Sequence, residues 1–249
     1  MPNSSAATFG SVLDDLLRRD PGRPLVTFYD HATGERVELS VTTYANWVAK
    51  VAGLLVEECD LERGQRLLVD LPPHWLGPVF LGAAWRVGLS VVHDEPADAV
   101  VCGPDSVERW AGSAATRPVL ACSLLPLGVR FRDPLPAGVL DVGVEVWSQP
   151  DAFSPYDPPT AQDDALPGTS QGDLMATAAA GSLLSDGGRL LTVSNPTSPS
   201  GVATFTEPLV RRGSMVLVAQ PDQDRLAATA RDERVTATCP AGLLAGPAD

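Results

Sequence analysis

Residues 66–92 read RLLVDLPPHWLGPVFLGAAWRVGLSVV, and this stretch decides the fold. An apolar run at residues 66–71 is followed by Pro72-Pro73, and a second apolar run at residues 89–92 follows Gly88. The residues between these runs have the length and apolar character of a helix. Two strands and a helix within about thirty residues are typical of a parallel β-α-β unit. The stretch therefore predicts an α/β fold with parallel strands.

The same alternation of helix and strand continues on both sides of this stretch. Before it, we expect a short helix at residues 11–19, a hairpin of strands at 25–29 and 36–39, and a helix from Ser40 or Thr42 to about Glu58. His31 falls in the turn of the hairpin, where we expect it to lie in solvent. After the stretch, we expect strands at residues 97–102, 118–120, 143–147, 189–193, 215–218 and 235–239, and helices at residues 106–111, 173–184, 208–212 and 222–233.

The amino-acid composition excludes several classes of function. The chain has 249 residues, of which 31 are acidic and 18 basic, and Lys50 is the only lysine. The formal charge is −13, and because nucleic-acid binding depends on clustered basic side chains, we expect no nucleic-acid partner. The longest mostly apolar run, residues 76–92, contains Arg86 and is too short to span a membrane. The first twenty residues show no secretory signal, so we expect a cytoplasmic protein with no membrane partner.

The cysteines and histidines do not have the spacing of a metal site. The four cysteines lie 20 or more residues apart without a Cys-x-x-Cys pair, and the chain has only three histidines. We expect the cysteines to be buried, reduced side chains. The sequence predicts no metal and no cofactor.

Prolines gather in residues 149–172, at positions 150, 155, 158, 159 and 167, together with several aspartates. Such a composition predicts an exposed connection. It is the one internal boundary that we expect in the chain.

Several stretches carry a family resemblance when they are read in order: residues 39–44 with 50–52, 61–67, 71–74 and 84–92, and later 188–193 and 209–239. Together they resemble the adenylate-forming (AMP-binding) superfamily, which includes acyl-CoA synthetases, luciferases and the adenylation domains of peptide synthetases. The resemblance implies an α/β core of largely parallel sheets flanked by helices, a truncated form of the family's N-terminal domain. It implies a single adenylation-like core over residues 1–249, with two interleaved subdomains. Residues 1 to about 60 would join residues 186–249, and residues 64–185 would form the other.

The resemblance does not extend to the chemistry of the family. Its members join a carboxylate to ATP and hold the phosphates in a Ser/Thr/Gly-rich loop ending in Pro-Lys-Gly. The corresponding residues 166–173 read LPGTSQGD and contain no lysine, while Lys50 lies in the first long helix. The family's adenine-binding segment and C-terminal lid would lie beyond Asp249. We therefore expect no adenylation and assign no catalytic residue.

Two loops are candidates for binding a ligand. The loop at residues 168–172 precedes a predicted helix, whose free N–H groups bind anions, although a simple turn and helix cap is the alternative. The loop at residues 194–201 follows a predicted parallel strand, where ligands of α/β sheets bind, although a surface loop without a ligand is the alternative. The candidate residues are Gly168, Thr169, Ser170, Gly172, Ser194, Asn195, Thr197 and Ser200.

Two histidines lie where acid–base chemistry is conceivable. His74 stands at a predicted helix start, and His93 precedes Asp94 and Glu95 at the carboxyl end of a predicted strand. Because neither lies in a recognisable catalytic motif, we interpret both as structural.

Three functions stay open at this point. The first is a non-catalytic acyl-CoA synthetase-like protein that binds a small acyl or nucleotide-like ligand. The second is an incomplete adenylate-forming ligase that a partner subunit completes. The third is an interaction module that binds a protein partner or a second copy of itself.

Overall fold

The structure is a computed structural model that describes residues 7–244. The first of its two large sheets contains β1 (Pro24–Asp30), β2 (Arg36–Ser40), β10 (Arg189–Thr192), β11 (Ser214–Ala219) and β12 (Ala237–Cys239), in the order β12-β10-β11-β1-β2. The second sheet contains β3 (Arg66–Asp70), β4 (Ser90–Val92), β5 (Ala99–Cys102), β6 (Val119–Ala121) and β7 (Val139–Asp141), in the order β4-β3-β5-β6-β7. All strand pairs in both sheets are parallel except β1 with β2.

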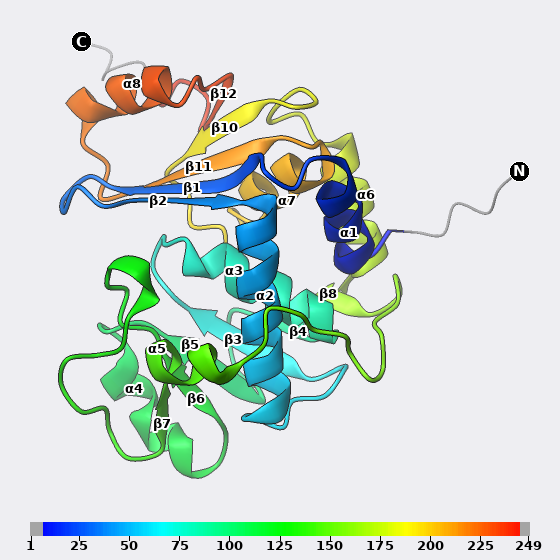
Figure 1. The fold of residues 1–249 in the computed structure, drawn as a ribbon, viewed down its shortest axis with the longest axis vertical. Helices are drawn as coiled ribbons and strands as arrows, with labels where there is room; N and C mark the ends of the chain where they lie inside the picture. Colours follow the sequence, from blue (N-terminus) through cyan, green and yellow to red (C-terminus); the bar gives the residue numbers. More distant parts are fainter. Residues whose placement is uncertain (1–6, 245–249) are drawn as a thin grey trace, which may run out of the picture.

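A layer of helices separates the two sheets (Figure 1). It consists of α1 (Phe9–Arg19), α2 (Val41–Glu57), α3 (Leu76–Val87), α6 (Gln171–Ala180) and α7 (Ala203–Val210). Of the residues of α3, all but Arg86 are buried, because this helix lies in the middle of the layer. The β-α-β unit predicted from residues 66–92 is confirmed, with β3 and β4 paired in parallel on either side of α3 in the sequence.

Alternating side chains on the strands bury the two faces of each sheet separately. Met215 and Leu217 of β11 join the central core, whereas Val216 and Val218 pack under α8 (Gln223–Asp232). In the second sheet, Val101 joins the central core, and the opposite face packs against α4 (Val107–Ala111). The result is an α/β fold with helices on both faces of two largely parallel sheets, as the sequence predicts.

The two sheets take their strands from interleaved parts of the chain. The first sheet uses β1, β2 and β10–β12, and the second uses β3–β7. A single hydrophobic core nevertheless includes side chains from both sheets. The division into two subdomains therefore stays a prediction.

The prediction of a strand at residues 143–147 is wrong. The strand β7 comes earlier, and it is followed by α5 (Val142–Glu145) and a 3₁₀ turn, Val146–Ser148. The Asp141 carboxylate accepts a hydrogen bond from the Gly143 N–H (2.9 Å) and begins the helix. Val142 and Val146, four residues apart, are buried, so the apolar spacing here is that of a helix and not of a strand.

The prediction that His31 lies in solvent is also wrong. His31 is buried beneath α8, where its Nε2 lies 3.1 Å from the Thr229 hydroxyl and its Nδ1 accepts from the Asp222 N–H at 3.1 Å. The hairpin turn itself is confirmed at residues 31–35. The burial of His31 could not be predicted because α8, which covers one side of the turn, comes about 190 residues later in the chain.

The proline-rich connection is partly exposed, as predicted, but it also contains a small hairpin. Strands β8 (Asp164–Leu166) and β9 (Thr169–Ser170) pair in antiparallel fashion immediately before α6. Ala165 and Gln171 are fully buried within this segment. The connection is therefore fixed to the core at its end.

Candidate functional site

A crevice of about 530 Å³ opens at the carboxyl ends of β3 and β4. One wall is formed by residues 93–95, which follow β4, and by α4. The other wall is the loop that follows β10, residues 195–199. The crevice thus lies where the second sheet meets a loop of the first, which is the usual place for ligands in parallel α/β sheets.

The loop after β10 is fixed to the second sheet by Asn195. Its Nδ2 donates a hydrogen bond to the Leu71 carbonyl at 2.7 Å, and its Oδ1 accepts from the N–H (3.1 Å) and the hydroxyl (2.9 Å) of Thr197. Gly201 is required for the return of the loop, since a Cβ there would overlap the Asn195 carbonyl oxygen. Asn195 therefore positions the wall of the crevice, and its polar atoms are already bonded.

The opposite wall contains three side chains that sequence reasoning missed. Trp110 donates from Nε1 to the Asp70 carboxylate at 2.7 Å, and the Arg109 guanidinium lies 4.7 Å from the centre of the Trp110 ring. Arg109 also approaches the Asp70 carboxylate at 4.0 Å while its side chain stays 70% exposed. A signal for Asp70 was present in the sequence, because it is a carboxylate at the end of an apolar run that was predicted to be a parallel strand.

The charged groups at the mouth of the crevice are largely paired. Burial lowers the pKa of His93 despite the nearby Asp94 carboxylate, so the imidazole is neutral at pH 7. The Glu95 carboxylate forms an ion pair with Arg117, which lowers the pKa of Glu95. No nucleophile is hydrogen-bonded to His93 among the residues that the structure describes. The crevice has groups that can bind a ligand but no activated nucleophile.

The loop at residues 168–172 lies elsewhere. Gly168, with φ +70°, makes the turn between β8 and β9, and Ser170 is the N-cap of α6, with its hydroxyl accepting from the Asp173 N–H at 3.1 Å. Gln171 is buried, where it accepts from the Phe9 N–H. None of Gly168, Thr169, Ser170 and Gly172 lines the crevice.

The structure thus separates the eight candidate residues. Asn195 and Thr197 line the crevice, whereas Ser194 and Ser200 flank its wall and the four residues of the other loop lie apart. The single lysine is in neither place. Lys50 on α2 donates to the Gln149 carbonyl at 2.6 Å and pairs with Asp151 at 3.0 Å.

His74 is a structural residue in this fold. It is buried at the start of α3, its Nδ1 accepts from the Leu76 N–H at 3.3 Å, and its ring packs against Phe28 with centroids 4.9 Å apart. Burial lowers the pKa of His74 to about 3. The imidazole is therefore neutral, and it does not line the crevice.

Within residues 7–244, no group of three or more His, Cys, Asp or Glu side chains could hold a metal ion. Over the same residues, no helix is both long enough and apolar enough to cross a membrane.

The fold defines a class, since it matches part of the fold of the acyl-CoA synthetases, which are adenylate-forming enzymes. The chain superposes on an acyl-CoA synthetase of Brucella canis with a TM-score of 0.76 at 16% identity, covering 95% of this chain and 47% of that one. It superposes on acetoacetyl-CoA synthetase of Streptomyces lividans with a TM-score of 0.74 at 17% identity, covering 92% of this chain and 41% of that one. The predicted resemblance is confirmed for the fold, and the chain spans half or less of the length of these enzymes.

The particular family follows from sequence similarity. A Mycobacterium tuberculosis protein described as a TIGR03089 family protein is 34% identical over 236 residues, which cover 91% of this chain and 96% of the relative. The chain belongs to the TIGR03089 family. No model of a known protein family matches the chain.

Proposed function

We propose that this protein is a non-catalytic relative of the acyl-CoA synthetases that binds a small acyl or nucleotide-like ligand in the crevice. The observation that carries this proposal is the tight β8–β9 turn in the segment where the family resemblance implies the phosphate loop. Ser170 caps α6 there, the turn contains no cation, and Lys50 is bonded to Gln149 and Asp151 on another element.

The lack of a lysine in this segment directly affects the adenylation reaction. Adenylation gathers negative charge on the phosphates in its transition state, and removal of one electrostatic donor typically slows such reactions by about a hundredfold to a thousandfold. In the segment that corresponds to this loop by resemblance, Ser170 is itself hydrogen-bonded to the Asp173 carboxylate at 2.7 Å. A carboxylate at this place repels phosphate, so both the lost lysine and the local charge oppose adenylation.

The crevice retains what a binding site needs. Its volume falls within the range of about 300–1,000 Å³ that is common for small-molecule sites. Trp110 and Leu71 supply apolar surface, and Arg109 supplies an exposed guanidinium suited to a carboxylate or phosphate. We propose Arg109 and Trp110 as the ligand-binding residues, with Asn195 and Thr197 holding the wall.

Calorimetric titration tests this proposal. The purified chain is titrated with ATP, AMP, CoA and non-hydrolysable acyl-adenylate analogues, and the Arg109→Ala variant is compared with Arg18→Ala, a matched exposed arginine on α1. We expect at least one ligand to bind, the Arg109 variant to bind at least tenfold more weakly, and the Arg18 variant to bind as the wild type does. Absence of binding by every ligand would contradict the proposal.

A second candidate is a ligase that a partner subunit completes. The chain spans 41–50% of the length of the solved synthetases and ligases that it matches, and in this alternative a partner supplies the segments that those enzymes have in addition. Copurification from the native cell followed by an ATP–pyrophosphate exchange assay of the complex tests it. Exchange by the complex but not by the isolated chain would support completion by a partner.

We also propose that the protein acts in a reducing compartment such as the cytoplasm. All four cysteines are free thiols, and Cys59, Cys102 and Cys122 are buried. Burial raises the pKa of the Cys59 and Cys102 thiols to about 12, so these groups are unreactive toward oxidation. This supports a structural role for the thiols.

A further inference from the structure

Four large apolar side chains are exposed together on one corner of the second sheet. They are Leu127 and Val129 in the loop after β6, Val144 on α5, and Trp147 in the 3₁₀ turn that follows. Leu127 is 73% exposed and Trp147 is 56% exposed. We call these four residues the Trp147 patch. Clustered exposed Leu, Val and Trp side chains mark protein interaction surfaces.

The contacts beneath the patch show that its two segments lie side by side. Trp47 of α2 packs against Trp147, with ring centroids 5.7 Å apart, and a Cβ on Gly128 would lie 3.2 Å from the same Trp47 ring. A Cβ on Gly143 would touch the backbone of Val129. The exposed side chains therefore stand on a fixed and well-packed base.

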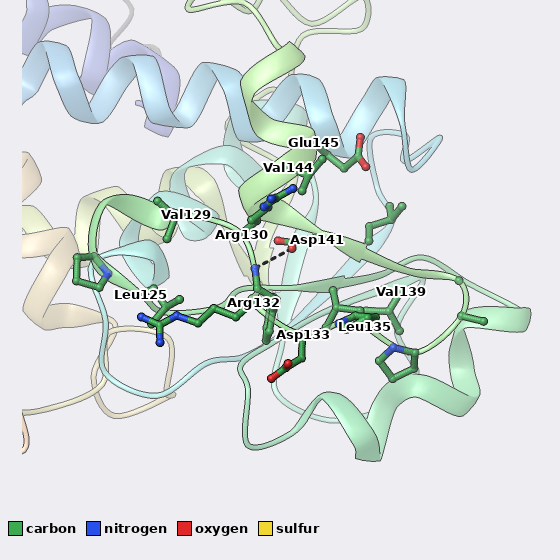
Figure 2. Close-up of a pocket in the computed structure, with 17 residues that line it drawn as sticks. Leu125, Val129, Arg130, Arg132, Asp133, Leu135, Val139, Asp141, Val144 and Glu145 are labelled. Carbon is green, nitrogen blue, oxygen red and sulfur yellow. Dashed lines mark hydrogen bonds between the residues drawn. The ribbon is translucent and has the colours of Figure 1, made fainter.

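A groove of about 1,070 Å³ lies directly beside the patch (Figure 2). Val129 and Val144 belong to both, and the groove continues past Leu125 and along the residues of β7. Because β7 is the last strand of its sheet, nothing in the sheet pairs with its outer edge. Protruding apolar side chains and a hollow thus occupy the same face, which is the arrangement that two copies related by a two-fold axis can use reciprocally.

The charges around the groove indicate which partner fits. Arg130, Arg132, Asp133 and Glu145 line the groove, and none of them forms an ion pair within residues 7–244. Asp141 also lines the groove, and its carboxylate accepts a hydrogen bond from the Phe131 N–H at 2.9 Å, as the dashed line in Figure 2 shows. Two arginines and three carboxylates therefore line the groove, so its charges nearly cancel, in a chain with a net charge of −13.

Two copies of such an acidic chain repel each other across most of their surfaces. The Trp147 patch is uncharged and the charges of the groove nearly cancel, so two copies can meet here with little repulsion, and the arginines of the groove can face the carboxylates of the other copy. We propose that the protein forms a two-fold symmetric dimer in which the Trp147 patch of each copy occupies the groove of the other.

Sedimentation equilibrium of the full chain between about 1 and 100 μM tests the dimer. We expect reversible dimerisation, and we expect Trp147→Glu and Leu127→Glu each to weaken it by about thirtyfold or more, which is typical of a central interface residue. The matched control is Tyr156→Glu, because Tyr156 is an exposed aromatic residue that lies outside the patch. Circular dichroism of all three variants should match the wild type. Leu127→Glu and Tyr156→Glu should also melt as the wild type does, whereas Trp147→Glu should melt lower because it loses the contact with Trp47.

The salt dependence of dimerisation provides a second test. If the copies meet through a neutral, apolar patch, raising NaCl from about 50 to 500 mM screens the general repulsion and tightens the dimer. Arg130→Glu should weaken the dimer, and the double variant Arg130→Glu with Glu145→Arg should recover part of the loss by restoring the charge balance. A wild-type chain that stays monomeric at every concentration and salt would overturn the proposal. So would a dimer that Trp147→Glu and Leu127→Glu leave intact, or a monomer that binds only a different protein.

Discussion

The Nζ of Lys50 lies 2.6 Å from the carbonyl oxygen of Gln149, and this bond joins α2 to the start of the proline-rich connection. Asp151 takes part in the same contact as an ion pair at 3.0 Å. The only lysine of the chain therefore holds two segments together that are about one hundred residues apart, and it is not available to a phosphate.

A Lys50→Met substitution should consequently change stability and not ligand binding. Loss of a charge-assisted hydrogen bond to a buried carbonyl typically costs about 1–2 kcal/mol. Urea unfolding should show a decrease of this size in the free energy of unfolding, while calorimetric affinity in the crevice stays the same. A variant that keeps its stability but loses ligand binding would show that Lys50 contacts the ligand.

The buried network around Glu233 should be the most sensitive ionic site. Its carboxylate, which is 8% exposed, accepts from the Tyr29 hydroxyl at 2.5 Å and from Arg36 at 3.0 Å, and it pairs with Arg189. Glu233→Gln removes the buried counter-ion of Arg189 and Arg36 and leaves them only the more exposed Glu38 carboxylate, and we expect it to cost about 3 kcal/mol.

The matched control for Glu233 is Asp186→Asn. Asp186 also pairs with an arginine, Arg211, but its side chain is 85% exposed. Exposed pairs contribute little, so thermal and urea unfolding of this variant should match the wild type. Equal losses from the two substitutions would contradict the network's role.

The stability of the protein should fall as the pH drops below about 6.5. The pKa of His74 is about 3 in the folded protein, against an ordinary value of 6.5, so below pH 6.5 the unfolded chain binds a proton that the folded chain does not. Each pH unit down to about 3 then costs about 1.4 kcal/mol from this residue. Burial also lowers the pKa of His31 and of His93, and both add to the slope in the same direction.

His74→Asn tests this assignment between pH 5 and 6.5, where most carboxylates stay ionised. The variant should be less stable than the wild type at pH 7.5, because a smaller side chain leaves a cavity beside Phe28. Its free energy of unfolding should depend less on pH, by about 1.4 kcal/mol per unit. An unchanged slope would show that His74 takes up its proton in both states.

Variants of Asn195 and Ser200 distinguish a residue that positions the wall of the crevice from one that only belongs to the same loop. Asn195→Ala removes the link to the Leu71 carbonyl, so the wall of the crevice should move and ligand affinity should fall about tenfold or more. Ser200→Ala changes a residue that does not line the crevice, and its affinity should be that of the wild type. The reverse result would place the ligand at the other end of the loop.

Local sequence signals were sufficient for most of the fold. Ser40 begins α2 by accepting from the Thr43 N–H, and Gly88 ends α3 with φ +93°, so both helices begin or end near where the sequence predicts. The prediction of a strand at residues 143–147 was wrong because the spacing of Val142, Val144, Val146 and Trp147 fits both a strand and a helix. The Asp141 cap, which decides between them, depends on contacts with residues on both sides.

The candidate site was harder to predict because it is assembled from distant segments. Asn195 and Thr197 were found from their place after a strand, but Arg109 and Trp110 come from a helix five residues long that shows no motif. They reach the crevice only because β5 lies next to β3, which puts α4 beside Asp70. The order of the strands within a sheet cannot be predicted from the local sequence of any single strand.

The measurement that tests the central claim most directly is ATP–pyrophosphate exchange by the purified chain with a panel of short, medium and long carboxylic acids. The tight β8–β9 turn, the Ser170 cap and the remote Lys50 predict exchange no faster than in a control without protein. Exchange that depends on both the carboxylic acid and the folded chain would contradict the account, because it would show that this scaffold adenylates without a phosphate-loop lysine.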